Sequence, residues 1–189
     1  MDPLQDLVRY YRWLRRYGYN DSHSGNASVR EGDRYWVTPG GAAADLLQTR
    51  ELVACSLSAG PGEGASLDAA LHAEVYRRVP AANAVLHSHG AYSVAMTLNG
   101  RDFEPCDFEG RYYFGRVPVL DIPYEAYLEQ APGAVAQALA DGARVVVVRG
   151  HGVYAAAETL DLAYKWTCSL ELSARTAWIA RQAGTLPAQ

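Results

Sequence analysis

A run of four valines at residues 145–148 constrains the fold more than any other segment of the chain. Successive β-branched residues favour an extended strand, and a strand that is apolar on every side chain needs both of its faces covered. The sheet that contains this strand should therefore lie between helices. At 189 residues the chain suits one compact domain, because two full domains would be cramped at this length.

Apolar periodicity and turn signals divide the rest of the chain into further strands and helices. We expect strands at residues 27–30, 34–38, 52–57, 84–87, 116–122, 144–149 and 153–156. We expect helices at residues 4–14, 46–50, 66–79, 91–98, 133–140 and 160–177. The predicted fold class is α/β, a three-layer single domain over residues 1–189 in which helices cover one sheet.

Charge, hydropathy and cysteine spacing exclude several classes of partner. The net charge is −4 and no run of Lys or Arg stands out, which argues against nucleic acid or an anionic membrane as a partner. No stretch of about 20 apolar residues is present for crossing a membrane. Cys55, Cys106 and Cys168 are odd in number and far apart, so we expect free thiols in a reducing cytoplasm.

Two of the five histidines, His87 and His89, stand at the end of the expected strand 84–87. Residues i and i+2 of an extended chain point to the same face. The spacing therefore directs two imidazoles towards one point, as a metal ion requires. The alternative interpretation is a pair of partly exposed residues at the end of a strand.

A third histidine, His151, follows the valine strand and lies between Gly150 and Gly152. Flanking glycines allow the backbone to turn sharply and to approach its neighbours closely. Three imidazoles and an open position form the ligand set of a catalytic zinc or another late transition metal. Taken alone, His151 would be an ordinary turn residue, but together with His87 and His89 it predicts a metal site.

Two further segments carry candidate site residues. Asp68 and His72 are four residues apart on an expected helix and so share one face. Asp68 would be either a fourth metal ligand and proton-transfer base or a capping carboxylate, and the spacing leaves both open. Gly25 and Asn26 belong to a small-residue turn that would either bind a hydroxylated or anionic substrate or simply reverse the chain.

In this order, the motifs resemble those of the class II aldolase/adducin family, over about residues 4–180. The matching segments are residues 24–30 (SGNASVR), 37–41 (VTPGG), 66–68 (SLD), 71–72 (LH), 83–89 (NAVLHSH), 117–119 (VPV) and 149–152 (RGHG). The resemblance implies an α/β/α domain that assembles as a homotetramer with its sites at subunit interfaces. It also implies a divalent metal, most often zinc, held by His87, His89 and His151 with Asp68.

The activity that the resemblance implies is that of an aldehyde-lyase. Such an enzyme cleaves a small, sugar-like hydroxy-carbonyl substrate through a metal-stabilised enediolate. The family also contains epimerases, dehydratases and decarboxylases that share this chemistry, and a non-catalytic adducin module. These remain the alternative functions. Asp68 would serve as the catalytic base, and Glu109 would be a second acid because it lies in the segment where relatives place one.

The chain departs from the family pattern at several of these positions. Asp68 stands where the family's aldolases have Glu. The family's phosphate pocket matches Gly25, Asn26, Gly40, Gly41 and Ser66 of this chain, together with Leu67. Gly40 and Leu67 replace hydroxyl residues, and a leucine side chain has no donor for phosphate. We therefore expect a substrate that is unphosphorylated or anchored through another group, such as a carboxylate.

Overall fold

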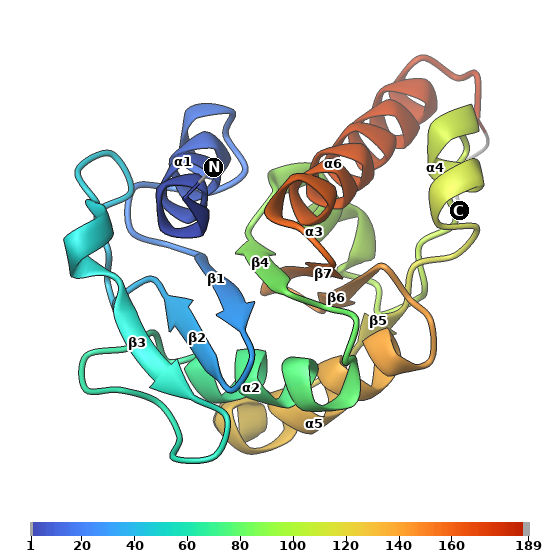
Figure 1. The fold of residues 1–189 in the computed structure, drawn as a ribbon. Helices are drawn as coiled ribbons and strands as arrows, with labels where there is room; N and C mark the ends of the chain where they lie inside the picture. The colour runs from blue at the N-terminus through green and yellow to red at the C-terminus, as the bar shows by residue number, and fades with distance from the viewer. Residues whose placement is uncertain (1, 187–189) are drawn as a thin grey trace.

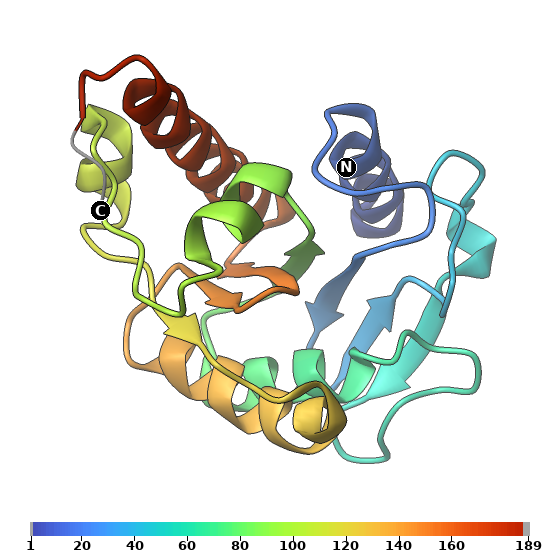
Figure 2. The same ribbon diagram turned by 180° about the vertical axis from the view of Figure 1, so that it is seen from behind.

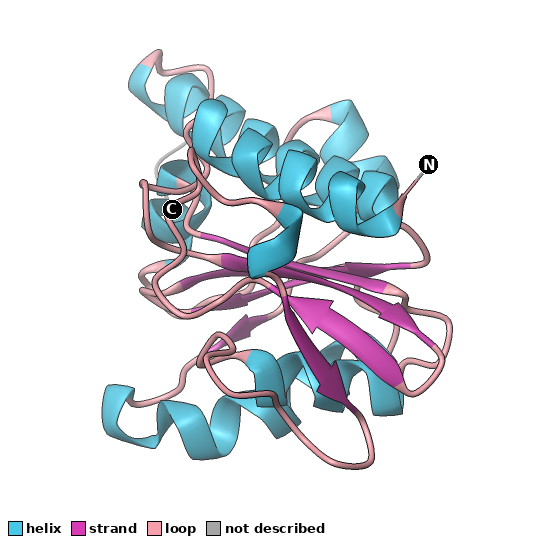
Figure 3. Ribbon diagram, turned by 60° about the vertical axis from the view of Figure 1, so that its left-hand side comes forward, coloured by secondary structure: helices cyan, strands magenta, loops and turns pink. Residues whose placement is uncertain are grey.

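The computed structural model describes residues 2–186 and has one seven-stranded sheet between two layers of helices (Figures 1 and 3). The strand order is β3-β2-β1-β4-β7-β6-β5, and every pair is antiparallel except β5 with β6. The strands are β1 (Asn26–Glu31), β2 (Arg34–Val37), β3 (Val53–Ser56), β4 (Ala84–Ser88), β5 (Val119–Leu120), β6 (Val145–Val148) and β7 (Gly152–Ala157).

Helices cover both faces of the sheet. On one face lie α2 (Ala69–Arg78) and α5 (Tyr127–Ala140), which form the lower layer in Figure 1 and in the reverse view of Figure 2. On the other face lie α1 (Pro3–Arg16), α3 (Ala91–Thr97) and α6 (Leu160–Gln182). The predicted three-layer α/β/α fold is confirmed. No helix among the described residues is long and apolar enough to cross a membrane.

The valine strand, β6, is apolar on both faces and is covered by a helical layer on each, as the sequence predicts. Val146 and Val148 pack into the core beneath α2 and α5, whereas Val145 and Val147 pack into the core beneath α6. Strand β4, which β7 separates from β6, alternates in the same way, since Val85 joins the first core and Leu86 faces α1 and α6. Central strands that are apolar on both faces therefore need both helical layers.

Two expected elements differ from the structure. The helix expected at residues 46–50 is wrong, because the chain makes turns there and then one short 3₁₀ segment, Thr49–Glu51. Leu47 is the one buried residue of this segment and Leu46 is 74% exposed, so a helix here would have too narrow a buried apolar face to stabilise it. The strand expected at residues 116–122 shrinks to Val119–Leu120, because only this part pairs with β6.

Two helices extend beyond the sequence prediction. The helix α4 (Phe108–Tyr113), which packs on α6, was not expected. The helix α5 begins at Tyr127 rather than at residue 133 and contains Pro132. Proline ordinarily interrupts a helix because it lacks an N–H donor. Burial of the α5 side chains Ala131 and Val135 on either side of Pro132 keeps this helix continuous.

Candidate metal centre

The floor of the site is a row of three side chains on three adjacent strands. Asn26 of β1 stands opposite His87 of β4, and His87 stands opposite Tyr154 of β7. Residues that are paired across strands point to the same face of a sheet. The register therefore sets Asn26, His87 and Tyr154 side by side on the face covered by α2 and α5. The Tyr154 ring stacks on the His87 ring with centroids 4.0 Å apart and planes 1° from parallel.

His89 follows the end of β4, and Asn20 fixes its backbone. The His89 N–H donates to Asn20 Oδ1 at 2.8 Å and to the Tyr19 carbonyl oxygen at 2.8 Å. Gly25 lies against this arrangement with φ 68°, and a side chain there would collide with Asn20 and with the His87 carbonyl. The loop that follows α1 therefore holds the His-Ser-His segment in place.

His151 occupies the turn between β6 and β7, where its two flanking glycines have different roles. Gly150 has φ 69°, a left-handed conformation that favours glycine. Gly152 instead provides space, because a Cβ atom there would lie 2.7 Å from His89 Cδ2 and 2.9 Å from His87 Cε1. The two glycines thus allow His151 to approach the other two imidazoles.

The three imidazoles converge through their Nε2 atoms. His87 Nε2 is 2.8 Å from His89 Nε2 and 3.2 Å from His151 Nε2. Burial lowers the pKa of all three rings, that of His89 to about 4, so the rings are neutral and can donate lone pairs. His87 Nδ1 lies 3.1 Å from the Val153 carbonyl oxygen, which accepts its proton and leaves Nε2 as the ligand atom.

This donor set fits a divalent transition metal. Tetrahedral zinc binds imidazole nitrogens at about 2.0–2.1 Å, which separates them from one another by about 3.3 Å. The potential ligand atoms of His87, His89 and His151 all lie within 4.8 Å of one another. Lone pairs that converge at such distances repel each other unless a cation lies between them. The sequence-predicted triad is thus brought together in a form suited to a metal ion.

Asp68 stands beside this cluster at the N-cap of α2. Its Oδ1 accepts a hydrogen bond from the Tyr127 hydroxyl at 2.8 Å. Its Oδ2 accepts from Asn26 Nδ2 at 2.8 Å and from the Tyr154 hydroxyl at 2.9 Å. Oδ2 also lies 3.8 Å from His87 Nε2. Burial alone would raise the pKa of Asp68, but the hydrogen bonds that Asn26 and Tyr127 donate to the carboxylate lower it, and the pKa stays below its usual value. The carboxylate is therefore ionised.

A cavity of about 490 Å³ opens onto the three imidazoles and Asp68. All five residues expected to bind substrate line it, namely Gly25, Asn26, Gly40, Gly41 and Ser66. Leu67, Tyr124 and Leu128 add an apolar rim, and these side chains are 79%, 90% and 63% exposed. The exposed Glu125 also lies at this rim, and no Lys or Arg is among the described residues of the lining.

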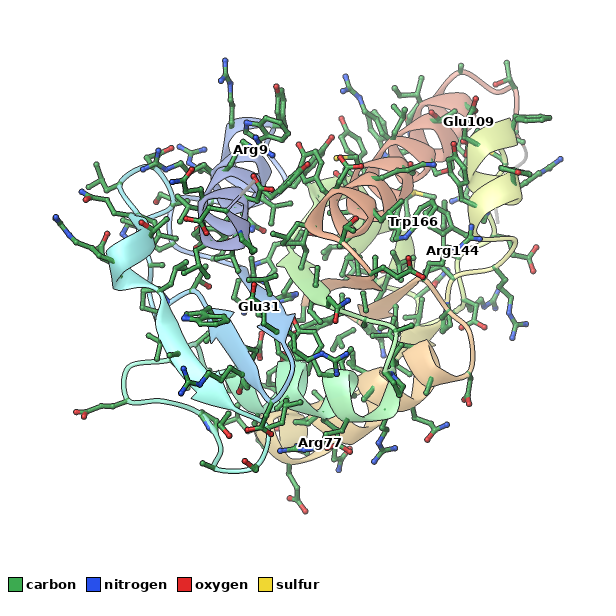
Figure 4. All side chains as sticks on the ribbon, in the orientation of Figure 1. Arg9, Glu31, Arg77, Glu109, Arg144 and Trp166 are labelled. Atoms are coloured by element: carbon green, nitrogen blue, oxygen red, sulfur yellow. The ribbon has the colours of Figure 1, made fainter. Side chains whose placement is uncertain are left out.

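Two sequence candidates lie elsewhere. Glu109 is exposed on α4, beside α6, on the face of the sheet opposite α2 and α5 (Figure 4). It does not line the cavity within this chain, and its role as an acid stays a prediction. His72 is fully buried behind the site, where its Nδ1 lies 2.6 Å from the Ser28 hydroxyl.

Sequence reasoning missed Tyr127, Tyr154 and Asn20. The sequence would point to Tyr154 as a site residue only if the strand register that pairs it with His87 were known. Tyr127 begins a helix whose first turn the sequence did not predict, and its ring contacts that of His151 edge-on at 4.7 Å. Asn20 looks like an ordinary residue after a helix, and its contacts with the His87–His89 backbone depend on tertiary structure.

Comparison with known proteins supports the family resemblance that the sequence motifs indicate. A family described as class II aldolase and adducin N-terminal domain matches residues 5–178. The chain belongs to this family. It is 27% identical to an L-fuculose phosphate aldolase of Methanocaldococcus jannaschii over 165 residues, which cover 87% of this chain and 88% of the relative. It is 30% identical to a methylthioribulose-1-phosphate dehydratase of Gluconacetobacter diazotrophicus over 176 residues, covering 85% and 84%.

A solved structure of the family superimposes on the whole chain. The crystal structure of L-fuculose-1-phosphate aldolase from Thermus thermophilus matches with a TM-score of 0.89 at 32% identity, covering 100% of both chains. The architecture of this class II aldolase family member is therefore that of its relatives.

Proposed function

We propose that this chain is a metal-dependent aldehyde-lyase of the class II aldolase type that cleaves a small hydroxy-carbonyl substrate. The observation that carries the proposal is the convergence of three neutral imidazoles, with an ionised Asp68 beside them, at the floor of an open cavity. A non-catalytic binding module would have no need for such an open ligand set. His87, His89 and His151 would hold the ion, and zinc is the metal we expect.

When bound, the ion would polarise the oxygens of the substrate and offset the negative charge that develops as the C–C bond breaks. The residues of the chain orient the substrate. Asn26 Oδ1 has no partner among the described residues, because Asn26 Nδ2 is committed to Asp68. Asn26 lines the cavity, so a small shift of its side chain would let this buried oxygen accept a hydrogen bond from a substrate hydroxyl. The cavity is lined at Gly40 and Gly41 by backbone alone, which leaves room for the substrate chain.

The lining favours a substrate without a phosphate group. The backbone N–H groups of Gly40 and Ser66 already donate to Gly64 and Thr38, and Leu67 adds apolar surface. Gly40 and Leu67 replace two hydroxyl donors of the family's phosphate pocket. Charge-assisted hydrogen bonds contribute roughly 1.5–3 kcal/mol each, so this loss weakens the affinity for phosphate by about two to four orders of magnitude. Competition kinetics with L-fuculose 1-phosphate and free L-fuculose tests this argument. A hundredfold preference for the phosphate in kcat/KM would refute it.

The proposal also covers the oligomeric state of the protein and its cellular compartment. We expect a homotetramer, because the exposed apolar rim of the cavity suits burial against a neighbouring subunit. Light scattering at micromolar concentration that reported a monomer would contradict this. A reducing compartment such as the cytoplasm also stays a prediction, consistent with the free thiols of Cys55, Cys106 and Cys168.

The experiment that tests the proposed reaction combines elemental analysis with a retro-aldol screen. Purified protein should contain about one divalent ion per chain and should release an aldehyde from one of a panel of phosphorylated ketoses, free ketoses and hydroxy-keto acids. Removal of the ion with a chelator should abolish the release, and re-addition should restore it. Protein that neither contains nor takes up metal would refute the proposal.

Dehydration is the second candidate reaction, favoured by the 30% identity to a methylthioribulose-1-phosphate dehydratase. The same screen separates the two reactions, because dehydration releases water and leaves the carbon chain intact. Mass spectrometry of the product would show two fragments for a lyase and one product lighter by a water molecule for a dehydratase. Epimerisation and decarboxylation remain alternatives. Decarboxylation would give a product lighter by CO2, whereas an epimer keeps the mass of the substrate and would be detected by chromatography or NMR.

A further inference from the structure

The carboxylate of Asp68 is held by more hydrogen bonds than a mobile acid or base requires. It accepts from Asn26 Nδ2 and from two tyrosine hydroxyls, each at 2.8–2.9 Å. A carboxylate offers about four lone-pair positions, so three are occupied by protein donors. The two hydroxyls, those of Tyr127 and Tyr154, also contact each other. Asp68 therefore has little freedom to change its orientation.

The tyrosine hydroxyls approach Asp68 from two independent elements. Tyr154 is fully buried on β7, in register with His87, whereas Tyr127 is the first residue of α5 and borders the cavity. Asp68 itself stands at the N-terminus of α2. The N-terminal ends of α2 and α5 both carry partial positive charge, which favours an anion at this point.

We propose that Tyr127 and Tyr154 are positioning residues that hold Asp68 as a fixed anion facing the three imidazoles, where its charge supports metal binding. This inference rests on the proposed metal-dependent function. It assigns a role to two residues that no sequence motif singled out. It also accounts for the orientation of Asn26, whose amide nitrogen must face Asp68 because its carbonyl oxygen would repel the carboxylate.

The test measures metal affinity in chelator competition, with zinc as the probe. Tyr127→Phe and Tyr154→Phe remove one hydroxyl each and retain the ring, so the stacking of residue 154 on His87 persists. Loss of a partner that orients a metal site costs about 10–100-fold in affinity, and we expect each variant to fall in this range. The visible spectrum of the Co²⁺-loaded protein should shift in the same variants.

The matched control is Tyr10→Phe. The buried Tyr10 also donates to a carboxylate, that of Asp161 at 3.0 Å, but this pair links α1 to α6 on the opposite face of the sheet. The control variant loses the same type of hydrogen bond, and we expect its zinc affinity to stay within about twofold of the wild type.

A double-mutant cycle with Asp68→Asn separates positioning from packing. If the tyrosines act through Asp68, their replacement in the Asp68→Asn background should change zinc affinity less than about twofold. Two results would overturn the inference while leaving the metal centre intact. The first is that the tyrosine replacements lower zinc affinity as strongly in the Asp68→Asn protein as in the wild type. The second is that the Tyr127→Phe and Tyr154→Phe variants bind zinc as tightly as the wild type. Wild-type protein without zinc affinity would instead overturn the proposed metal centre, and the inference with it.

Discussion

Gly152 is the residue at which a single added methyl group should distinguish metal binding from folding. In a Gly152→Ala variant, the new Cβ would lie 2.7 Å from His89 Cδ2 and 2.9 Å from His87 Cε1, and it would overlap the Ser88 carbonyl oxygen. Ordinary van der Waals contact begins near 3.4 Å. The two imidazoles must therefore move by about 0.7 Å and 0.5 Å, and β7 must also shift away from β4, because only a backbone movement relieves the overlap with the Ser88 carbonyl oxygen.

Both consequences have expected magnitudes. An extra methyl group forced into a packed interior costs about 1–3 kcal/mol. For a domain of this size, that lowers the Tm by roughly 2–12 °C. Metal ligands must keep their distances to within about 0.2 Å, so a shift of 0.5–0.7 Å exceeds this tolerance several-fold. We expect zinc affinity to fall at least 10–100-fold, the range seen on disturbing ligand orientation.

The assay is zinc competition against a chromophoric chelator, with thermal unfolding of the metal-free protein recorded in parallel. Gly142→Ala is the control, because Gly142 has φ 102° and no atom within 4 Å of a new Cβ. Backbone strain costs that variant about 1–2 kcal/mol without touching a ligand. If Gly152→Ala bound zinc as tightly as the wild type, the steric reasoning would be refuted. If Gly142→Ala lost as much zinc affinity as Gly152→Ala, the zinc affinity of these variants would reflect only the stability of the fold.

Replacing any one of the three clustered histidines with Ala should remove most of the bound metal in elemental analysis, and full retention would contradict its role as a ligand. Protons compete with metal as the pH falls through the pKa of a ligand, which for His89 is lowered to about 4. Zinc affinity should therefore hold from pH 8 to 6 and decline below about pH 5, whereas a decline centred near pH 6.5 would indicate exposed imidazoles. Glu171→Ala should lower the free energy of unfolding by about 2–3 kcal/mol in urea titration. The buried Glu171 carboxylate accepts from the N–H groups of Tyr92 and Ser93 at the start of α3, and an unchanged midpoint would show that these donors find water instead.

Local pattern was enough to predict the layered fold. The valines of β6 require cover on both faces, and the expected strands and long helices recur in the structure with shifted ends. The elements that the pattern missed are short or contain proline. The helix α4 has six residues, and α5 continues through Pro132 because tertiary packing outweighs the cost of the missing N–H.

The sequence also predicted that three particular histidines would lie close together. Residues i and i+2 at a strand end share a face whatever the rest of the fold is, and a glycine-flanked histidine after a buried strand has room to join them. The convergence of His87, His89 and His151 agrees with that expectation. Their neutral, lone-pair-donating state follows from burial, which the apolar segments around them imply.

Only the tertiary structure decided what surrounds these histidines. Asn26, His87 and Tyr154 lie side by side because of strand register. Tyr127 reaches Asp68 because α2 and α5 begin next to each other on the same face of the sheet. Register and helix placement depend on contacts between residues far apart in sequence, which local periodicity does not encode. The sequence therefore determined which three histidines converge, whereas long-range packing determined the hydrogen bonds that orient Asp68 beside them.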